Sequence, residues 1–276
     1  MAKKKATSKK AANQKVEAKP VKKVESTVKK TAKAPAKESA LDRITNPKSL
    51  AQFAAELVGT FLLTVLIFAT QAQPLALLFG LTIIVLILGN VSGAHVNPLI
   101  TVGAWATRRI GSLRALGYVI AQFLGSMLAF VVAKTFVDMA PEVTGYYGQK
   151  TAATLTTASA IPEAYQWGIL FAELLGAAIF AFAVAHVTAN KKHNNTATAF
   201  GVGGGLFIGA YIGSYLATLL QGGVILNPAV AVALQAFTVE STNTAWAIAT
   251  YLGASLIGGL LGFGFSKLIK NTEEEK

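Results

Sequence analysis

The sequence reads SGAHVNPL at residues 92–99 and GGVILNPA at residues 222–229, so an Asn-Pro pair interrupts a strongly hydrophobic region in each half of the chain. Proline is favoured at the first position of an α-helix, and asparagine is a good cap just before it. Each stretch is therefore predicted to be a loop that turns into a short helix, roughly 97–108 in the first half and 227–238 in the second. Paired interrupted helices of this kind indicate a permeation or binding site in a membrane protein.

The composition predicts a membrane protein. The chain has 276 residues, of which 53% are hydrophobic, and this share exceeds what soluble domains usually show. Several windows are apolar over the roughly 20 residues that a helix needs to span a bilayer. The expected spans are 51–70, 75–92, 113–137, 165–189, 197–219 and 244–268. The predicted fold is an all-α membrane protein with six transmembrane helices and two re-entrant half-helices.

The charges outside the N-terminal region predict the orientation of the spans. Arg108, Arg109 and Arg114 precede the third span, Lys191 and Lys192 lie between the fourth and fifth, and Lys267 and Lys270 follow the sixth. Basic loops belong on the cytoplasmic side. We therefore expect a multi-pass protein of the cell membrane with both termini in the cytoplasm.

The N-terminal region is unlike the rest of the chain. Residues 1–48 hold 15 lysines and arginines against 4 acidic residues and contain no aromatic residue. Such a segment is expected to be a disordered cytoplasmic tail. It is either a solvated tail without a partner or a segment that binds anionic lipid. Nucleic acid is not expected as a partner, because the tail has no groups that read or stack on bases.

Three pairs of segments match in the same order and define an internal repeat. AELVG at 55–59 matches AELLG at 172–176, VNP at 96–98 matches LNP at 226–228, and IAQFLGS at 120–126 matches IATYLGA at 248–254. Each half holds three spans, an odd number, so the second half must be inverted relative to the first. The predicted channel domain covers 49–270, with repeats at about 50–137 and 165–268 and a C-terminal cytoplasmic tail at 271–276.

These motifs resemble those of the aquaporin, or major intrinsic protein, family. The resemblance rests on the two Asn-Pro boxes, the glutamate in the first and fourth spans, SGAH before the first box and GYVIAQ in the third span. It implies an aquaporin-like fold, one channel per subunit in a homotetramer, and passive transport of water or small uncharged solutes. It also implies that membrane lipid surrounds the protein.

The two boxes are the candidate permeation site. They consist of Asn97, Pro98 and Leu99 in the first half and Asn227, Pro228 and Ala229 in the second. Two helix N-termini that meet head to head place partial positive charge at the centre, and the asparagine amides offer N–H donors there. The loop carbonyls before the boxes are expected to line the two half-channels and to offset the dehydration of a solute. They belong to Gly93, Ala94, His95, Gly223, Val224 and Ile225.

Glu56 and Glu173 are ionisable residues within predicted spans, and such residues are costly in a membrane. They have two interpretations. In a proton-coupled transporter they would relay protons, whereas in a channel they would accept backbone N–H bonds from the re-entrant loops. The symmetry of the pair favours the second interpretation.

The chain departs from the family pattern where the resemblance implies a selectivity filter. The family places arginine directly after the second Asn-Pro-Ala, and this chain has Val230 there. The other filter positions are predicted at Tyr215, Val224 and either Leu77 or Phe79, depending on the alignment. The expected constriction is apolar apart from one phenol, and an apolar ring either passes larger neutral solutes or dewets and closes.

Three functions therefore stay open. The first is an aquaporin-type channel for water and small uncharged solutes. The second is a channel of the same fold for larger neutral solutes, such as glycerol or protonated weak acids, and the third is a non-conducting junction protein that uses Tyr146 and Tyr147 of the loop 138–164.

An enzyme is not expected, because no nucleophile–base set, metal cluster or phosphate loop is visible, and neither metal nor cofactor is predicted. The chain also has no cysteine.

Overall fold

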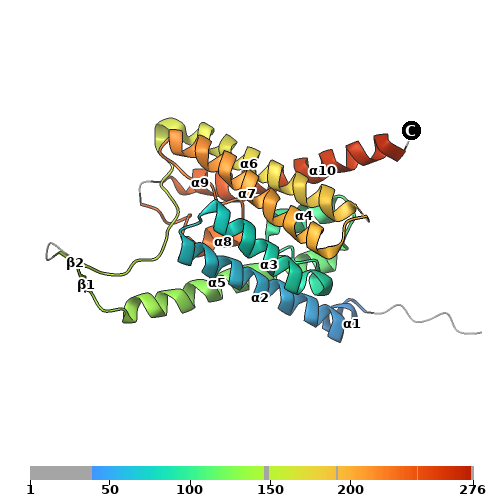
Figure 1. The fold of residues 1–276 in the computed structure, drawn as a ribbon, viewed down its shortest axis with the longest axis horizontal. Coiled ribbons are helices and arrows are strands. Elements are labelled where there is room, and N and C mark those ends of the chain that lie inside the picture. The colour runs from blue at the N-terminus through green and yellow to red at the C-terminus, as the bar shows by residue number, and fades with distance from the viewer. Residues whose placement is uncertain (1–38, 146–148, 191, 241, 275–276) are drawn as a thin grey trace, which may run out of the picture. The chain divides into compact units, whose positions relative to one another are not determined.

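We describe the protein from a computed structural model, which covers residues 39–145, 149–190, 192–240 and 242–274 (Figure 1). Tyr146, Tyr147, Lys191 and residues 1–38 of the predicted tail lie outside this range. The described elements are α1 (Ala40–Thr45), α2 (Pro47–Thr70), α3 (Pro74–Ser92), α4 (Pro98–Ala106), α5 (Ser112–Met139), β1 (Val143–Thr144), β2 (Lys150–Thr151), η1 (Glu163–Tyr165), α6 (Gln166–Ala189), α7 (Asn195–Leu219), α8 (Pro228–Ala233), α9 (Thr244–Ala247), η2 (Ile248–Ala254) and α10 (Ser255–Glu274).

Six helical segments of the described chain are long and apolar enough to cross a membrane. They are Pro47–Thr70, Pro74–Ser92, Ser112–Met139, Glu163–Ala189, Asn195–Leu219 and Thr244–Thr272. These segments confirm the six spans predicted from hydropathy. The two half-helices are also present as α4 and α8, and both are shorter than the sequence suggested.

Prolines and caps explain where the helices begin and end. α2 starts at Pro47 after Asn46, whose side chain accepts a bond from the Ser49 amide at 2.9 Å. α3 starts at Pro74 and ends at Gly93, which has a φ of 94°. This left-handed conformation suits glycine and ends a helix sharply. The chain therefore leaves α3 at Gly93 and restarts as a helix at Pro98, and Ala94 and Val96 between them also have positive φ values of 47° and 44°.

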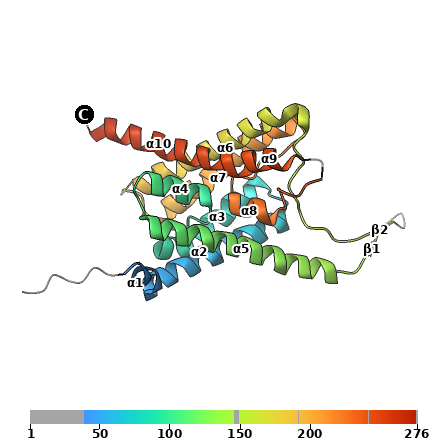
Figure 2. The ribbon, with the colours of Figure 1, turned by 180° about the vertical axis from the view of Figure 1, so that it is seen from behind.

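Each half-helix packs against a span of the other half. α4 contacts α10, and α8 contacts α5 (Figure 2). The two halves also meet where α3 packs on α7. The half-helices thus link the two repeats, as an inverted repeat with re-entrant segments requires.

The glycine run at 201–205 holds α7 close to its neighbours. A Cβ at Gly203 would lie 2.2 Å from Oγ1 of Thr82 and 2.3 Å from the carbonyl oxygen of Leu78, both on α3. A Cβ at Gly204 would meet nothing within 4 Å. Close helix packing through small residues, which is common in membrane proteins, therefore explains Gly203.

Three local features differ from the sequence prediction. The loop 138–164 contains a two-stranded hairpin, in which Val143 pairs with Thr151. The sixth span contains a π-helical turn, η2, that the repeat alignment did not suggest. α10 continues to Glu274 and so extends beyond the sixth span expected at 244–268.

Candidate functional site

The two asparagines of the Asn-Pro boxes meet at the centre of the bundle. Nδ2 of Asn97 donates to the carbonyl oxygen of Leu226 at 2.7 Å, and Nδ2 of Asn227 donates to the carbonyl oxygen of Val96 at 3.0 Å. Each side-chain oxygen caps its own half-helix. Oδ1 of Asn97 accepts from the Leu99 amide at 3.0 Å, and Oδ1 of Asn227 accepts from the Ala229 amide at 3.1 Å. Each asparagine therefore fixes both its own helix and the loop of the other half.

The carboxylate of Glu56 holds the first loop in shape. Its oxygens accept the amides of His95 at 2.9 Å and Val96 at 2.7 Å. They also accept the hydroxyl of Ser92 at 2.6 Å and Nε2 of Gln122 at 2.8 Å. Glu56 is fully buried. Four donors on one buried carboxylate offset the cost of removing it from water.

Glu173 holds the second loop in the same way. Its oxygens accept the amides of Ile225 and Leu226, both at 2.8 Å, and the hydroxyl of Ser255. Gln122 of the first half corresponds to Thr250 in the repeat. The Thr250 hydroxyl is buried and has no partner among the described residues. Ser255, which directly follows the π-helical turn, supplies the donor instead.

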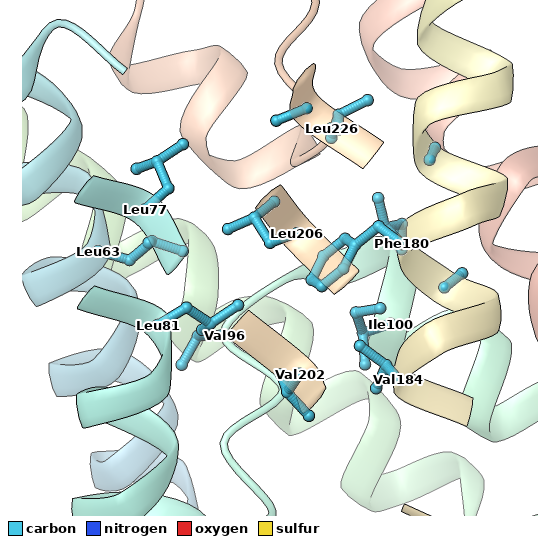
Figure 3. Close-up of a cluster of buried hydrophobic side chains, with 14 of the residues drawn as sticks. Leu63, Leu77, Leu81, Val96, Ile100, Phe180, Val184, Val202, Leu206 and Leu226 are labelled. Atoms are coloured by element: carbon cyan, nitrogen blue, oxygen red, sulfur yellow. The ribbon is translucent and has the colours of Figure 1, made fainter. Parts of the chain in front are cut away.

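A small cavity lies between the two boxes. Its volume is about 20 Å³, and Asn97, Asn227 and His95 contribute its polar lining. The rest of the wall is apolar. It consists of Leu63, Ile67, Leu77, Leu81, Val96, Phe180, Leu206 and Ile225, and Figure 3 shows six of these side chains in the buried cluster. A water molecule needs about 10–15 Å³, so this central cavity has room for one water-sized group.

A larger cavity lies beside the central cavity, toward one end of the bundle. It has a volume of about 360 Å³, and its lining includes Gly93, Ala94, His95 and Arg109. His95 and Phe180 line both cavities and separate them. We name this end, which carries Arg108, Arg109 and Arg114, the arginine side.

Arg109 is fixed at the wall of the 360 Å³ cavity. Its Nη1 donates to the carbonyl oxygen of Ala185 at 2.9 Å and lies 3.1 Å from Oγ1 of Thr188. Its guanidinium carbon lies 5.0 Å from the ring centroid of Phe263. Partial burial lowers the pKa of Arg109 from its ordinary value, yet arginine keeps its charge in proteins. The cavity therefore carries a fixed positive charge, from a residue that the sequence analysis used only to predict the orientation of the spans.

The opposite end, which we name the hairpin side, is covered by the segment 156–161. The Ala158 amide donates to the carbonyl oxygen of Leu234 at 2.8 Å, and the Ile161 amide donates to Oγ1 of Thr242 at 2.8 Å. Ile161 is buried. The carbonyl of Gly223 accepts the Tyr251 hydroxyl at 3.3 Å, so this loop carbonyl has a protein partner.

The structure brings some of the predicted filter residues to the centre and leaves others outside. Leu77 lines the central cavity, Val224 packs half-buried against the core, and Val230 is fully buried within it. Phe79 and Tyr215 are 54% and 62% exposed. They belong to exposed apolar stripes at helical spacing, Phe79 with Ile83 and Ile87 on α3, and Tyr215 with Ile208, Tyr211 and Leu219 on α7. The structure therefore does not place Phe79 or Tyr215 at the constriction.

The sequence reasoning missed several residues that support the site. Gln122 donates to Oγ1 of Thr101 at 2.9 Å, and that hydroxyl lies 3.1 Å from Nδ1 of His95. The Tyr118 hydroxyl donates to the carbonyl of Ser92 at 2.6 Å, and its ring stands edge-on to His95. The sequence pointed to this network only through the motif GYVIAQ, which contains Tyr118 and Gln122, and through the repeat match of Gln122. Long-range hydrogen bonds between spans leave no local pattern in a sequence.

The chain belongs to the family described as Major intrinsic protein, whose sequence profile matches residues 71–266. Members of this family are channels and not enzymes. The chain is 32% identical to Glycerol uptake facilitator protein-like 6 of Lactiplantibacillus plantarum over 187 residues, which cover 64% of this chain and 80% of that protein. It is 28% identical to Aquaporin Z of Photorhabdus laumondii over 246 residues, which cover 80% of this chain and 97% of that protein.

The fold agrees with a solved structure of the same family. The aquaglyceroporin from Plasmodium falciparum superposes with a TM-score of 0.65, although the sequences are only 19% identical. The match covers 82% of this chain and 99% of that one. It establishes the aquaporin-like fold.

Proposed function

We propose that this protein is a passive channel through which water and small uncharged solutes cross a membrane between Asn97 and Asn227. The observation that carries the proposal is the reciprocal hydrogen bonding of these two residues around the central cavity. Each amide nitrogen carries two hydrogens and donates one of them to a carbonyl oxygen of the opposite loop. The second N–H of each is a donor that a passing water or hydroxyl accepts.

The geometry favours neutral solutes over cations. The N-terminal ends of α4 and α8 both point at the central cavity and carry partial positive charge. Arg109 adds a full positive charge on the arginine side. A cation that entered this path would lose its hydration shell against apolar walls and meet repulsion, whereas a neutral molecule would lose only a few hydrogen bonds.

A second candidate function is conduction of larger neutral solutes, such as glycerol or protonated weak acids. Val230 supports this candidate, because it places neither charge nor donor where the family resemblance implies an arginine. The relative named as a glycerol uptake facilitator-like protein also supports it.

We further propose that the channel is a homotetramer in the cell membrane with both termini in the cytoplasm. The family resemblance supports the tetramer. The exposed apolar stripes on α3 and α7 are surfaces for lipid or for another subunit. The basic residues of the arginine side support a cytoplasmic location for that side.

The proposal is tested by stopped-flow light scattering on proteoliposomes, with paired osmotic shifts in sucrose and in glycerol. We expect faster shrinkage in sucrose than protein-free liposomes show. In the glycerol shift, the vesicles first shrink and then re-swell as glycerol enters. Slow re-swelling identifies a water channel, and fast re-swelling identifies the channel for larger neutral solutes. Rates equal to those of protein-free liposomes in both osmolytes, with the protein folded by circular dichroism, would contradict the proposal.

A further inference from the structure

A third cavity opens on the arginine side, next to the 360 Å³ cavity, with which it shares Arg109 and Ile110. Its volume is about 900 Å³, and it lies between α1, the first turns of α2, the end of α4 and the start of α5. Five cationic side chains line it, and no aspartate or glutamate does. The cations are Arg43, Lys48, Arg108, Arg109 and Arg114.

These cations have no carboxylate partner in the part of the chain that the structure describes. The ion pairs found there are Lys134 with Asp138 and Lys150 with Glu142, both elsewhere in the fold. Five like charges around one concave surface repel each other, and this repulsion is relieved by a bound anion. The cavity is therefore built for a group that carries negative charge.

Two neutral features of the cavity point to the same kind of ligand. The N-terminus of α5 opens into it, and the N-cap residue Gly111 supplies no side-chain cap. Unsatisfied amides at a helix N-terminus bind phosphate and other oxyanions. Gln52 also lines the cavity, is only 7% exposed, and its Oε1 has no partner.

We propose that this cavity binds a phosphate group, as carried by the headgroup of an anionic phospholipid. The cavity lies at the ends of the spans, where headgroups are found, and Trp105 on its wall is 47% exposed. Tryptophan is enriched at this level of a membrane. Leu50 and Leu116 are exposed on α2 and α5, the helices that frame the cavity, and offer apolar surface for acyl chains. A free phosphate carries the same chemistry, and the experiment separates the two sources.

The test uses Trp105 as a reporter in the full chain. Trp167→Phe and Trp246→Phe leave Trp105 as the single tryptophan, and brominated lipids quench a tryptophan that they touch. The protein is reconstituted in vesicles with brominated phosphatidylglycerol or brominated phosphatidylcholine, each over the same series of mole fractions. We expect half-maximal quenching at about a tenfold lower mole fraction of phosphatidylglycerol, because each cation near an anionic headgroup adds severalfold to affinity. Equal quenching by the two lipids would overturn the proposal.

Matched variants assign the preference to this cavity and not to the lysine-rich N-terminal region. Arg43→Gln/Lys48→Gln/Arg114→Gln is expected to abolish it, whereas Lys134→Gln/Lys192→Gln/Lys267→Gln removes three cations elsewhere and keeps it. If the first variant does not fold, Lys48→Gln alone is expected to reduce the preference severalfold. A preference that survives in the folded cavity variants would overturn the proposal.

A competition arm identifies the source of the phosphate. Release of the quencher by inorganic phosphate, but not by sodium chloride at equal ionic strength, assigns the site to phosphate from either source. Retention of the quencher under both salts assigns it to the lipid. Both readouts measure binding and not flux, so the inference stands or falls independently of the channel proposal.

Discussion

Asn97 and Asn227 each donate a hydrogen bond to the loop that carries the other. The donor–acceptor distances are 2.7 Å from Asn97 to the Leu226 carbonyl and 3.0 Å from Asn227 to the Val96 carbonyl. The acceptors directly precede the opposite asparagines in sequence. The two loops are thereby locked to each other, and neither box can shift without breaking a bond of the other.

Asn227→Asp separates the capping role of the asparagine from its donor role. The aspartate still accepts from the Ala229 amide, but its second oxygen faces the Val96 carbonyl where the amide donated. We expect loss of about 2 kcal/mol in the free energy of unfolding, because a buried carbonyl loses its donor. Water flux should fall with it, as measured by stopped-flow shrinkage of proteoliposomes.

The matched control is Asn194→Asp on α7. Asn194 also caps a helix, accepting from the Ala197 amide at 2.8 Å, but it is exposed. This substitution should alter the free energy of unfolding by no more than about 0.5 kcal/mol and leave the water flux unaltered. If Asn227→Asp changes stability and flux as little as Asn194→Asp does, Asn227 is no more than a helix cap, as Asn194 is.

Glu56→Gln tests the interpretation of the buried glutamates as loop supports. The carboxylate accepts four donors, and an amide in its place turns two of these contacts into donor facing donor. Hydrogen bonds to charged groups contribute about 1.5–3 kcal/mol, so we expect unfolding at a clearly lower temperature together with reduced flux. Glu163→Gln, the same change at an exposed site, should alter neither. If Glu56 instead relays protons, Glu56→Gln should leave the unfolding temperature unchanged, and this result would contradict the role as a loop support.

Gly203→Ala and Gly204→Ala differ by one position and should have opposite outcomes. The methyl group at 203 would collide with Thr82 and the Leu78 carbonyl, whereas the one at 204 would meet open space. Overpacking costs about 1–3 kcal/mol, and alanine for glycine in an open helical position is neutral or slightly stabilising. Thermal unfolding of the two variants in detergent measures the difference. Equal melting temperatures would show that α3 and α7 are not in close contact.

Val230→Arg tests whether position 230 sets the range of solutes. Val230 is fully buried beside Asn227, and its amide lies 3.4 Å from Oδ1 of that residue. The family resemblance implies that position 230 faces the channel, so we expect a guanidinium added there to narrow it and to lower the ratio of glycerol to water permeability. Paired glycerol and sucrose shifts on the variant and the parent measure this ratio. An unchanged ratio in folded protein would place the selectivity elsewhere, for example at the segment 156–161.

Much of the fold is predictable because its signals are local. A run of apolar residues marks a span, and an Asn-Pro pair marks the start of a half-helix wherever it falls. The inverted repeat follows from counting spans between matched motifs. Glu56 and Glu173 stand out because a charged residue inside a span needs partners.

Rotation of the spans is much harder to read from the sequence. α3 is apolar on all sides, with Leu77 and Leu81 inside and Phe79 and Ile83 outside. Hydrophobic periodicity therefore gives no preferred inner face. The family resemblance likewise selected Tyr215 on α7, which is 62% exposed. The π-helical turn before Ser255 and the burial of Ile161 depend on contacts between distant segments. Neither leaves a local signal.

The most direct test of the central claim measures water and proton movement in the same vesicles. Proteoliposomes loaded with a pH-sensitive dye are mixed with sucrose while light scattering reports their shrinkage, and a pH step is then applied to the same preparation. If neutral molecules alone pass between Asn97 and Asn227, the vesicles should shrink much faster than protein-free vesicles. Protons should enter them no faster than they enter protein-free vesicles. Shrinkage at the protein-free rate, or proton entry that rises together with water flux, would contradict it.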